Sequence, residues 1–373
     1  MNKIILFFAL IFFYGFSVFG QYLLPFEDEW NAGVFGYIDE TGKIIIPAQQ
    51  IGVPGQNWPQ PFSEGMLRKF TPTVQTTTFF RTDGSKITFP FESMSGFSNG
   101  ISRVFHNRES FFVDINGNRL PFNYSWVYRS HGGYYFNEGI AFVRDENNRI
   151  IAIDTSGNEL FELPTSFYNT SRKFSSGLLA VRNARGLWGY LDTTGAIVIP
   201  PRFALSRRLF ENRYSETRAN FQGNYAVLTD DGQNFYVINK QGEIIKSFQT
   251  VHFNFPLDAM FIHGDYLVYI PVHPREGVLH ISNLVTGEKL QVQLSKNPSR
   301  GSDHRCFPRR LGENIFFNGY IISYAGEVLF HVPDFNIITT DRLRIWYDKF
   351  IIIRNIGYFT IFDETGTEIT IRQ

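Results

Sequence analysis

The feature that most constrains this chain is a segment that occurs twice. Residues 35–47 read FGYIDETGKIIIP, and residues 188–200 read WGYLDTTGAIVIP. The turn glycine of this segment returns in weaker copies, so that turn glycines follow one another 33 to 47 residues apart. A period of about 40 residues specifies a stack of small units, because one such unit cannot bury its apolar face alone. The turn glycines are Gly42, Gly84, Gly117, Gly157, Gly195, Gly242, Gly287, Gly326 and Gly366.

A second motif, Phe-Ser-x-Gly or a close variant, runs in step with the first. Its copies end at Gly65, Gly100, Gly139 and Gly177, and each is followed by a short strand-like segment. One unit therefore contains this motif, a strand, a polar turn, an aromatic strand ending in Asp, the turn glycine, an apolar strand and a proline. We predict that each unit folds as a three- or four-stranded antiparallel meander.

The turn before the last strand follows from its residue types. Asp39 and Asp192 end a strand where a carboxylate can hydrogen-bond the backbone two residues on. Gly42 and Gly195 then supply the positive φ that closes a short hairpin with a bulge. The returning strand, residues 44–46 in the first copy, is predicted to be buried on both faces. Proline is predicted to end this strand, because it cannot donate to the ladder. The prolines are Pro47, Pro90, Pro164, Pro200 and Pro333.

Two glycines, Gly36 and Gly189, stand inside a predicted strand rather than in a turn. A missing side chain at such a place lets another group approach the backbone closely. We expect that group to be an aromatic ring from a neighbouring unit.

These residues together resemble the bacterial WG repeat family. The resemblance is most specific around Trp188 and Gly189, which follow a Phe-Ser-Ser-Gly motif and precede the complete turn. The first unit has Phe35 in place of Trp, the units between residues 62 and 164 lose Trp-Gly, and only the period survives beyond about residue 205. The resemblance implies all-β modules that mediate binding and share no catalytic residue.

The fold class predicted is all-β, with tandem meanders of about 40 residues arranged like a β-propeller. An open repeat array with capped ends is the alternative. Propellers usually have four to eight blades, so the number of turns is accommodated if a terminal strand completes the first blade. Two polar segments, near residues 205–220 and 295–313, are predicted to be loop-like insertions, and function tends to concentrate on such loops.

The amino-acid composition excludes several classes of function. The 373 residues carry 35 basic and 35 acidic side chains, so no net field attracts nucleic acid or anionic lipid. The single cysteine, Cys306, cannot form an internal disulfide. The 40 phenylalanines favour β structure. Many recur at fixed places in the units, as at Phe62, Phe97, Phe136 and Phe174.

The N-terminus predicts export. Lys3 precedes an apolar run over residues 4–19, and Val18 and Gly20 have the small-residue spacing of a cleavage site. The run is short for a membrane span. We therefore expect a signal peptide at residues 1–20, with cleavage before Gln21. The WG-type repeat domain over residues 21–373 would then be secreted or periplasmic, with no stable membrane insertion.

Two sets of residues are candidates for binding. Trp58 has a loop-like setting that suits an aromatic platform for a sugar ring, with core packing as the alternative. Arg305, Arg309 and Arg310 surround Cys306 as a small basic cluster that suits an anion, with a solvated loop as the alternative.

The metal-ligating residue types follow no metal motif. Five histidines between residues 252 and 304 suggest a metal or acid–base site, but their spacing fits no zinc motif. Asp114 opens a segment that starts like a calcium loop, but Arg119 occupies the place that requires Gly. No metal and no cofactor is therefore expected. The five histidines are His252, His263, His273, His280 and His304.

The function predicted is an exported module that recognises a protein or a cell-surface glycan without catalysis. A structural role in an envelope assembly differs from it only in the partner. The alternative is a propeller-based lyase or hydrolase with its site on loops between blades. Convergent His, Asp or Arg side chains in a central pocket would favour the enzyme, and an exposed aromatic patch would favour binding.

Overall fold

A computed structural model describes the chain at residues 22–28, 34–49, 59–69, 75–122, 124, 136–170, 173–204, 220–229, 231, 233–250, 259–295, 307–333, 343–354 and 358–371. The elements in these ranges are short antiparallel strands and the 3₁₀ helix η2, Pro274–Glu276.

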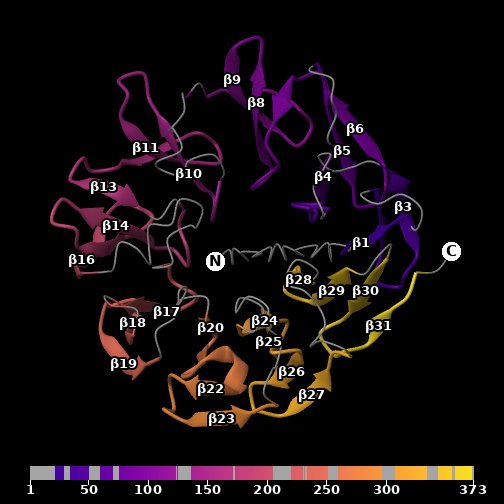
Figure 1. The fold of residues 1–373 in the computed structure, drawn as a ribbon. Coiled ribbons are helices and arrows are strands. Elements are labelled where there is room, and N and C mark those ends of the chain that lie inside the picture. Colours follow the sequence, from indigo (N-terminus) through magenta and orange to yellow (C-terminus); the bar gives the residue numbers. More distant parts are fainter. Residues whose placement is uncertain are drawn as a thin grey trace, which may run out of the picture.

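The described strands form nine open sheets of three or four strands, and within each sheet the strands follow in chain order. Figure 1 shows the sheets arranged round a ring, so the fold is all-β and propeller-like, as predicted. The first five sheets are β1 (Leu24–Glu27), β2 (Phe35–Ile38) and β3 (Ile44–Gln49); β4 (Met66–Lys69), β5 (Thr77–Arg81) and β6 (Lys86–Phe89); β7 (Ser93–Met94), β8 (Ile101–His106) and β9 (Glu109–Asp114); β10 (Ile140–Arg144), β11 (Ile150–Asp154) and β12 (Glu159–Glu162); and β13 (Phe167–Thr170), β14 (Leu179–Asn183), β15 (Trp188–Leu191) and β16 (Ile197–Phe203). The last four are β17 (Tyr225–Thr229), β18 (Asn234–Asn239) and β19 (Ile244–Gln249); β20 (Met260–His263), β21 (Tyr266–Tyr269), β22 (Val278–Asn283) and β23 (Lys289–Gln293); β24 (Arg309–Leu311), β25 (Asn314–Phe317), β26 (Tyr320–Ser323) and β27 (Val328–His331); and β28 (Leu343–Trp346), β29 (Phe350–Arg354), β30 (Phe359–Phe362) and β31 (Glu368–Ile369).

The hairpin turn has the geometry that its residues require. Asp39 Oδ1 accepts hydrogen bonds from the N–H groups of Thr41 at 2.9 Å and Lys43 at 3.1 Å. Gly42 has a φ of 85°, and the pairing of β2 with β3 shifts register as a bulge does. Asp192 accepts the corresponding bonds two and four residues on. The Asp–Gly hairpin is thus present in both complete copies of the repeat.

The outermost strands correct two expectations. Pro47 and Pro200 do not end their strands but lie inside β3 and β16. An edge strand tolerates proline because its outer side needs no backbone donor. Residues 44–46 are also not buried on both faces, since only Ile46 is buried there, as Ile199 is in β16. These strands lie at the rim of the ring, where one face meets solvent (Figure 1).

The strand glycines are enclosed by their own sheet. A Cβ on Gly189 would lie 2.4 Å from the carbonyl oxygen of Ile199. A Cβ on Gly36 would lie 2.4 Å from the ring of Phe26 and 2.6 Å from the carbonyl oxygen of Ile46. The expectation of a ring from a neighbouring unit is therefore wrong. The bulged outer strand of the same sheet approaches this position instead.

Neighbouring sheets meet at the turn glycines. A Cβ on Gly157 would lie 2.2 Å from the ring of Phe122, which follows β9 of the preceding sheet. A Cβ on Gly195 would lie 2.6 Å from the ring of Phe161 on β12. Each of these turns is thus laid against the outer part of the sheet before it, where a side chain would collide.

The phenylalanines of the Phe-Ser-x-Gly motif make a second set of contacts between sheets. The ring centroid of Phe62 lies 5.3 Å from that of Tyr37 on β2, and Phe97 lies 5.3 Å from Phe79 on β5. Phe174 stacks on the ring of Phe142 on β10. The repeated phenylalanines are therefore buried between one sheet and the previous one, which explains much of the aromatic content.

The first and last sheets also meet. Phe35 stacks on Phe359 of β30, with ring centroids 6.1 Å apart and planes at 11°. The Glu27 carboxylate binds the Arg354 guanidinium through contacts of 2.6 and 3.0 Å. None of the sheets in the described part combines strands from both chain ends. The expectation that a terminal strand completes the first blade is therefore wrong, and the ends meet through side chains.

The repeated aspartates make the stability of the fold depend on pH. The Thr194 hydroxyl contributes most to holding the pKa of Asp192 below its ordinary value; burial opposes it, and backbone N–H groups add to it. A carboxyl whose folded pKa is depressed stabilises the fold above its unfolded pKa, about 3.9, and loses this effect as pH falls through the folded pKa.

We expect Asp192→Asn to weaken the dependence of unfolding free energy on pH below about pH 4. Asn239 occupies the same turn position and accepts the equivalent backbone bonds, so Asn keeps the turn. Asp192→Ala removes the acceptor and should cost about 1 kcal/mol at pH 7. Urea unfolding at pH 7 and pH 3.5 measures both effects. An Asn variant with undiminished acid sensitivity would contradict the assignment.

Candidate functional site

A chain of polar contacts links the turns of successive sheets. In the Phe-Ser-x-Gly turns the residue at x has a positive φ. The Glu138 carboxylate accepts hydrogen bonds from the N–H groups of Ser176 at 2.6 Å and Gly177 at 2.8 Å, both in the next turn. Glu64 accepts one from Gly100 at 2.8 Å in the same way. The polar residues of this motif are therefore used to hold neighbouring sheets together.

The last three sheets keep the turns but lose the motif. Residues 261–264 read Phe-Ile-His-Gly, and the next two turns place Glu313 and Asp348 near the position of x. His263 Nε2 lies 3.3 Å from Glu313 Oε2, whose side chain is 84% exposed. Two of these turns therefore present exposed carboxylates, Glu313 and Asp348, to solvent.

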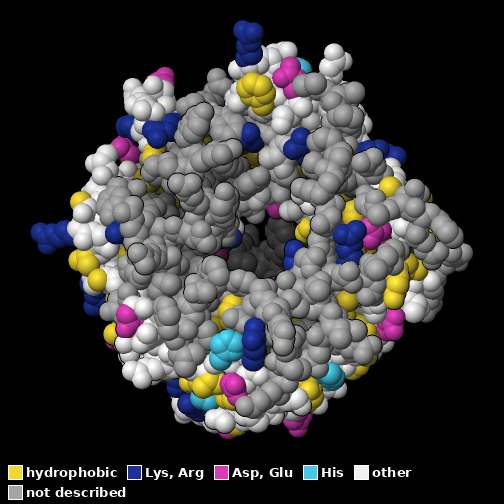
Figure 2. Space-filling view, in the orientation of Figure 1, with side chains coloured by type: hydrophobic (Ala, Val, Ile, Leu, Met, Phe, Trp, Pro, Cys, Tyr) yellow, Lys and Arg dark blue, Asp and Glu magenta, His cyan; other side chains and the backbone are white. Residues whose placement is uncertain are grey.

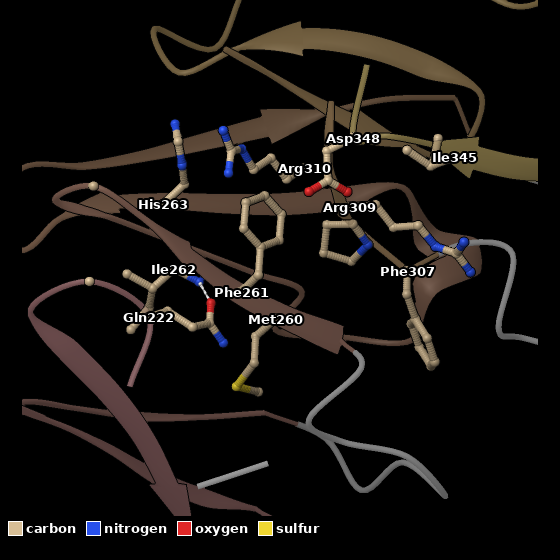
Figure 3. A pocket seen from close by; sticks show the side chains of 13 residues that line it. Gln222, Met260, Phe261, Ile262, His263, Phe307, Arg309, Arg310, Ile345 and Asp348 are labelled. Carbon is tan, nitrogen blue, oxygen red and sulfur yellow. Dashed lines mark hydrogen bonds between the residues drawn. The ribbon is translucent and has the colours of Figure 1, made fainter. Parts of the chain in front are cut away.

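A cavity of about 880 Å³ lies beside these turns. The inner strands β20, β24 and β28, with residues next to them, contribute most of its lining, and the turn before β17 contributes the rest (Figure 3). Figure 2 shows the molecule hollowed at the centre of the ring, with His and Lys or Arg side chains adjacent on its lower side. The volume lies within the range usual for ligand pockets. The lining residues are Gln222, Gly223, Met260, Phe261, Ile262, His263, Gly264, Phe307, Pro308, Arg309, Arg310, Ile345 and Asp348.

Arg310 is the best placed cation in the cavity. Its Nε donates to the carbonyl oxygen of Gly312 at 3.2 Å, which fixes the guanidinium plane. Its terminal nitrogens have no hydrogen-bond partner within the described ranges. Figure 3 shows its side chain beside that of His263, with the carboxylate of Asp348 between Arg310 and Arg309. The cavity therefore carries cations on either side of one carboxylate.

Tyr324 packs against this end of the cavity. Its ring stacks on His263 with centroids 5.6 Å apart and lies 4.9 Å from Tyr266. Burial raises the pKa of Tyr324 above its ordinary value, while Arg310 opposes the rise and Glu313 adds to it. The Tyr324 hydroxyl is buried with no hydrogen-bond partner in the described part of the chain. It therefore remains protonated at neutral pH.

The structure changes the setting of the predicted basic cluster. Arg309 and Arg310 line the cavity together, but from strand β24. The prediction of a loop over residues 295–313 is therefore wrong for this strand. The polar residues of β24 predicted a loop, but β24 is the inner edge strand of its sheet and borders the cavity. Three other predicted residues, Trp58, Arg305 and Cys306, lie outside the described residues.

The described histidines do not converge. His263 alone of these lines the cavity. His280 Nε2 lies 3.2 Å from Gln291 Oε1, and burial lowers the pKa of His280. His273 Nδ1 accepts a hydrogen bond from the N–H of Arg275 and caps η2. The other two, His252 and His304, lie outside the described residues.

Sequence reasoning missed most of the residues that line the cavity. Gln222 Oε1 accepts a hydrogen bond from the N–H of Ile262 at 2.7 Å, drawn in Figure 3, and Phe261 and Asp348 line the wall. The signal available was the loss of Phe-Ser-x-Gly in a unit that keeps its turn. That loss marks where the turns carry other side chains.

The described residues contain no group of three or more His, Cys, Asp or Glu side chains that could hold a metal. Asp114 accepts hydrogen bonds from the N–H groups of Asn116 and Asn118, as the other turn aspartates do. Within the same residues, no helix has the length and apolar character needed to cross a bilayer.

The fold and its linked turns define an all-β repeat protein. The family model described as "WG containing repeat" matches residues 35–49 and 188–204, so the chain contains WG repeats. A comparison with curated protein sequences finds no match.

Solved structures share the fold only distantly. The computationally designed Ika8 protein is 12% identical, with a TM-score of 0.43, and the match covers 92% of this chain and 100% of that one. BamB from Moraxella catarrhalis is 13% identical, with a TM-score of 0.38 and coverage of 74% and 83%. Virginiamycin B lyase from Staphylococcus aureus is 12% identical, with a TM-score of 0.31 and coverage of 72% and 91%. At these values the likeness carries no inference about function.

Proposed function

We propose that this protein is an exported interaction module that binds a protein or a cell-surface glycan in its central cavity. The observation that carries the proposal is the cavity itself, which lies among the turns of the last three sheets. Its wall combines apolar side chains with a few charged groups, which is the usual make-up of a binding pocket. The WG repeats agree with this role, because repeat modules of this kind generally mediate binding.

The proposed location is the periplasm or the outside of the cell. It rests on the N-terminal sequence, with a cleaved signal at residues 1–20 and a mature chain beginning at Gln21. Cell fractionation with N-terminal sequencing tests it. Recovery of the uncleaved chain from the cytosol would contradict it.

The alternative function is a propeller-based lyase or hydrolase, and one observation favours it. His263 is paired with Glu313 and lies beside Arg310 (Figure 3), which brings a base and a cation to one side of the cavity. The pair stands in solvent, however, because the Glu313 side chain is 84% exposed. Such a carboxylate orients an imidazole weakly compared with a buried one, so binding remains the better supported function.

Affinity capture from native envelope extract, with the mature chain as bait, separates the two functions. We expect one stoichiometric partner, and at least a tenfold lower recovery with Arg310→Gln, because this change removes a charge-assisted contact. Arg119→Gln is the matched control, since Arg119 is an exposed arginine of another sheet that pairs with Glu109. Equal recovery of a partner by both variants would show that the cavity is not the binding site. No partner, together with turnover of polysaccharide or ester substrates, would favour the enzyme.

A further inference from the structure

We infer that the occupant of the central cavity is an extended peptide segment that carries a carboxylate next to an apolar side chain. This inference rests on the proposed function and names the class of ligand. It places the carboxylate on Arg310 and the apolar side chain against the half-buried Phe261 and Ile345.

The charge argument begins with Arg310. Its guanidinium donates one hydrogen bond, from Nε to the carbonyl oxygen of Gly312. Its terminal N–H groups have no hydrogen-bond partner in the described part of the chain. A planar guanidinium presented in this way matches the two oxygens of a carboxylate. His263 lies beside it, but its Nε2 is paired with Glu313, so Arg310 supplies the contact (Figure 3). An anionic group is therefore favoured at this end of the cavity.

Part of the cavity wall is apolar. Phe261 and Ile345 are half-buried, whereas Met260 and Phe307 are almost fully buried behind them. Burying a side chain of the ligand against Phe261 and Ile345 removes apolar surface from water on both partners. The ligand therefore needs an apolar group within reach of its carboxylate.

Two observations favour a peptide over a sugar. A sugar ring needs many hydrogen-bond partners, but the amide oxygen of Gln222 already accepts the N–H of Ile262. The strand β24, moreover, pairs only with β25, so its other edge has no strand partner in the described sheets. An extended peptide can pair its backbone with a strand edge that lies beside a cavity.

A fluorescein-labelled tetrapeptide, Ala-Phe-Leu-Glu with a free C-terminus, tests this inference by fluorescence anisotropy on the mature chain. We expect binding that weakens between 50 and 500 mM NaCl, because exposed charges are screened. The amidated peptide Ala-Phe-Leu-Gln removes both carboxylates, and Ala-Ser-Gly-Glu removes the apolar side chains. Both should bind at least about tenfold more weakly.

Protein variants of opposite charge give a second readout. Arg310→Gln should weaken binding of the probe by about 10- to 100-fold, whereas Asp348→Asn should strengthen it about two- to fivefold by removing a like charge. Arg119→Gln should leave the affinity unchanged. Both cavity residues are exposed, so equal thermal midpoints confirm that the variants are folded.

The outcomes separate this inference from the proposed function. Equal binding of the amidated peptide, or weaker binding to Asp348→Asn, overturns the carboxylate assignment. Binding of an oligogalacturonate that Arg310→Gln abolishes, with no binding of the peptide, overturns the peptide and keeps the cavity as a binding site. No binding of either probe, with capture of the native partner unchanged by Arg310→Gln, overturns both proposals.

Discussion

Replacing Glu27 by alanine is expected to lower the free energy of unfolding by about 3–5 kcal/mol. The Glu27 side chain is 1% exposed and forms two contacts with the guanidinium of Arg354, which is 20% exposed. Removing the carboxylate leaves a cation in a mostly buried place without this partner, and the cost of an uncompensated charge is large. The two residues belong to the first and last sheets, so the variant also loosens the junction between the chain ends. Urea unfolding at pH 7 measures the loss.

The double variant Glu27→Met with Arg354→Met is the matched control. Well-packed apolar residues of similar size often replace a buried ion pair at little cost, so this variant should recover most of the stability lost by Glu27→Ala. The exposed pair of Arg119 and Glu109 lies within one sheet, and breaking it should leave the urea midpoint nearly unchanged. If Glu27→Ala behaved like the exposed pair, the ends of the chain would not depend on this contact.

The repeating part of the fold was predictable because its causes are local. Asp39 and Gly42 determine a hairpin within five residues, and the same combination occurs at Asp192 and Gly195. The burial of the motif phenylalanines followed from their period. The prediction that Pro47 ends its strand was wrong, because strand propensity does not indicate which strand lies at the edge of a sheet.

The junction of the chain ends was not predictable from local pattern. Glu27 and Arg354 are 327 residues apart, and neither belongs to a repeated motif. The predicted number of sheets was wrong for the same reason, because the number of turns does not show whether the two chain ends share a sheet. Long-range pairing of this kind depends on the summed geometry of all the units rather than on any one of them.

The candidate site was predictable in part. Arg309 and Arg310 were recognised by their charge, but their strand was read as a loop because inner strands facing a cavity tolerate polar residues. His263 was grouped with other histidines by proximity in sequence, and the fold separates it from His273 and His280. The stronger signal was the loss of the Phe-Ser-x-Gly motif in the last units, where the turns carry other side chains.

Replacing Gly157 by alanine is expected to destabilise the protein by about 2–5 kcal/mol. Gly157 has a φ of 84°, which costs an L-residue about 1–2 kcal/mol. Its added Cβ would also lie 2.2 Å from the ring of Phe122, so the turn and the preceding sheet must move apart. Overpacking of this kind typically costs about 1–3 kcal/mol. The two effects add because they arise from different atoms.

Gly287→Ala separates these two effects. Gly287 occupies a turn with a φ of 77°, but no atom lies within 4 Å of its added Cβ. This variant should therefore lose only about 1–2 kcal/mol from backbone strain. The difference between the two variants in urea unfolding then measures the contact between neighbouring sheets. Equal losses would mean that Phe122 moves aside without cost, and that the turn glycines serve the hairpins alone rather than the stacking of one unit on the next.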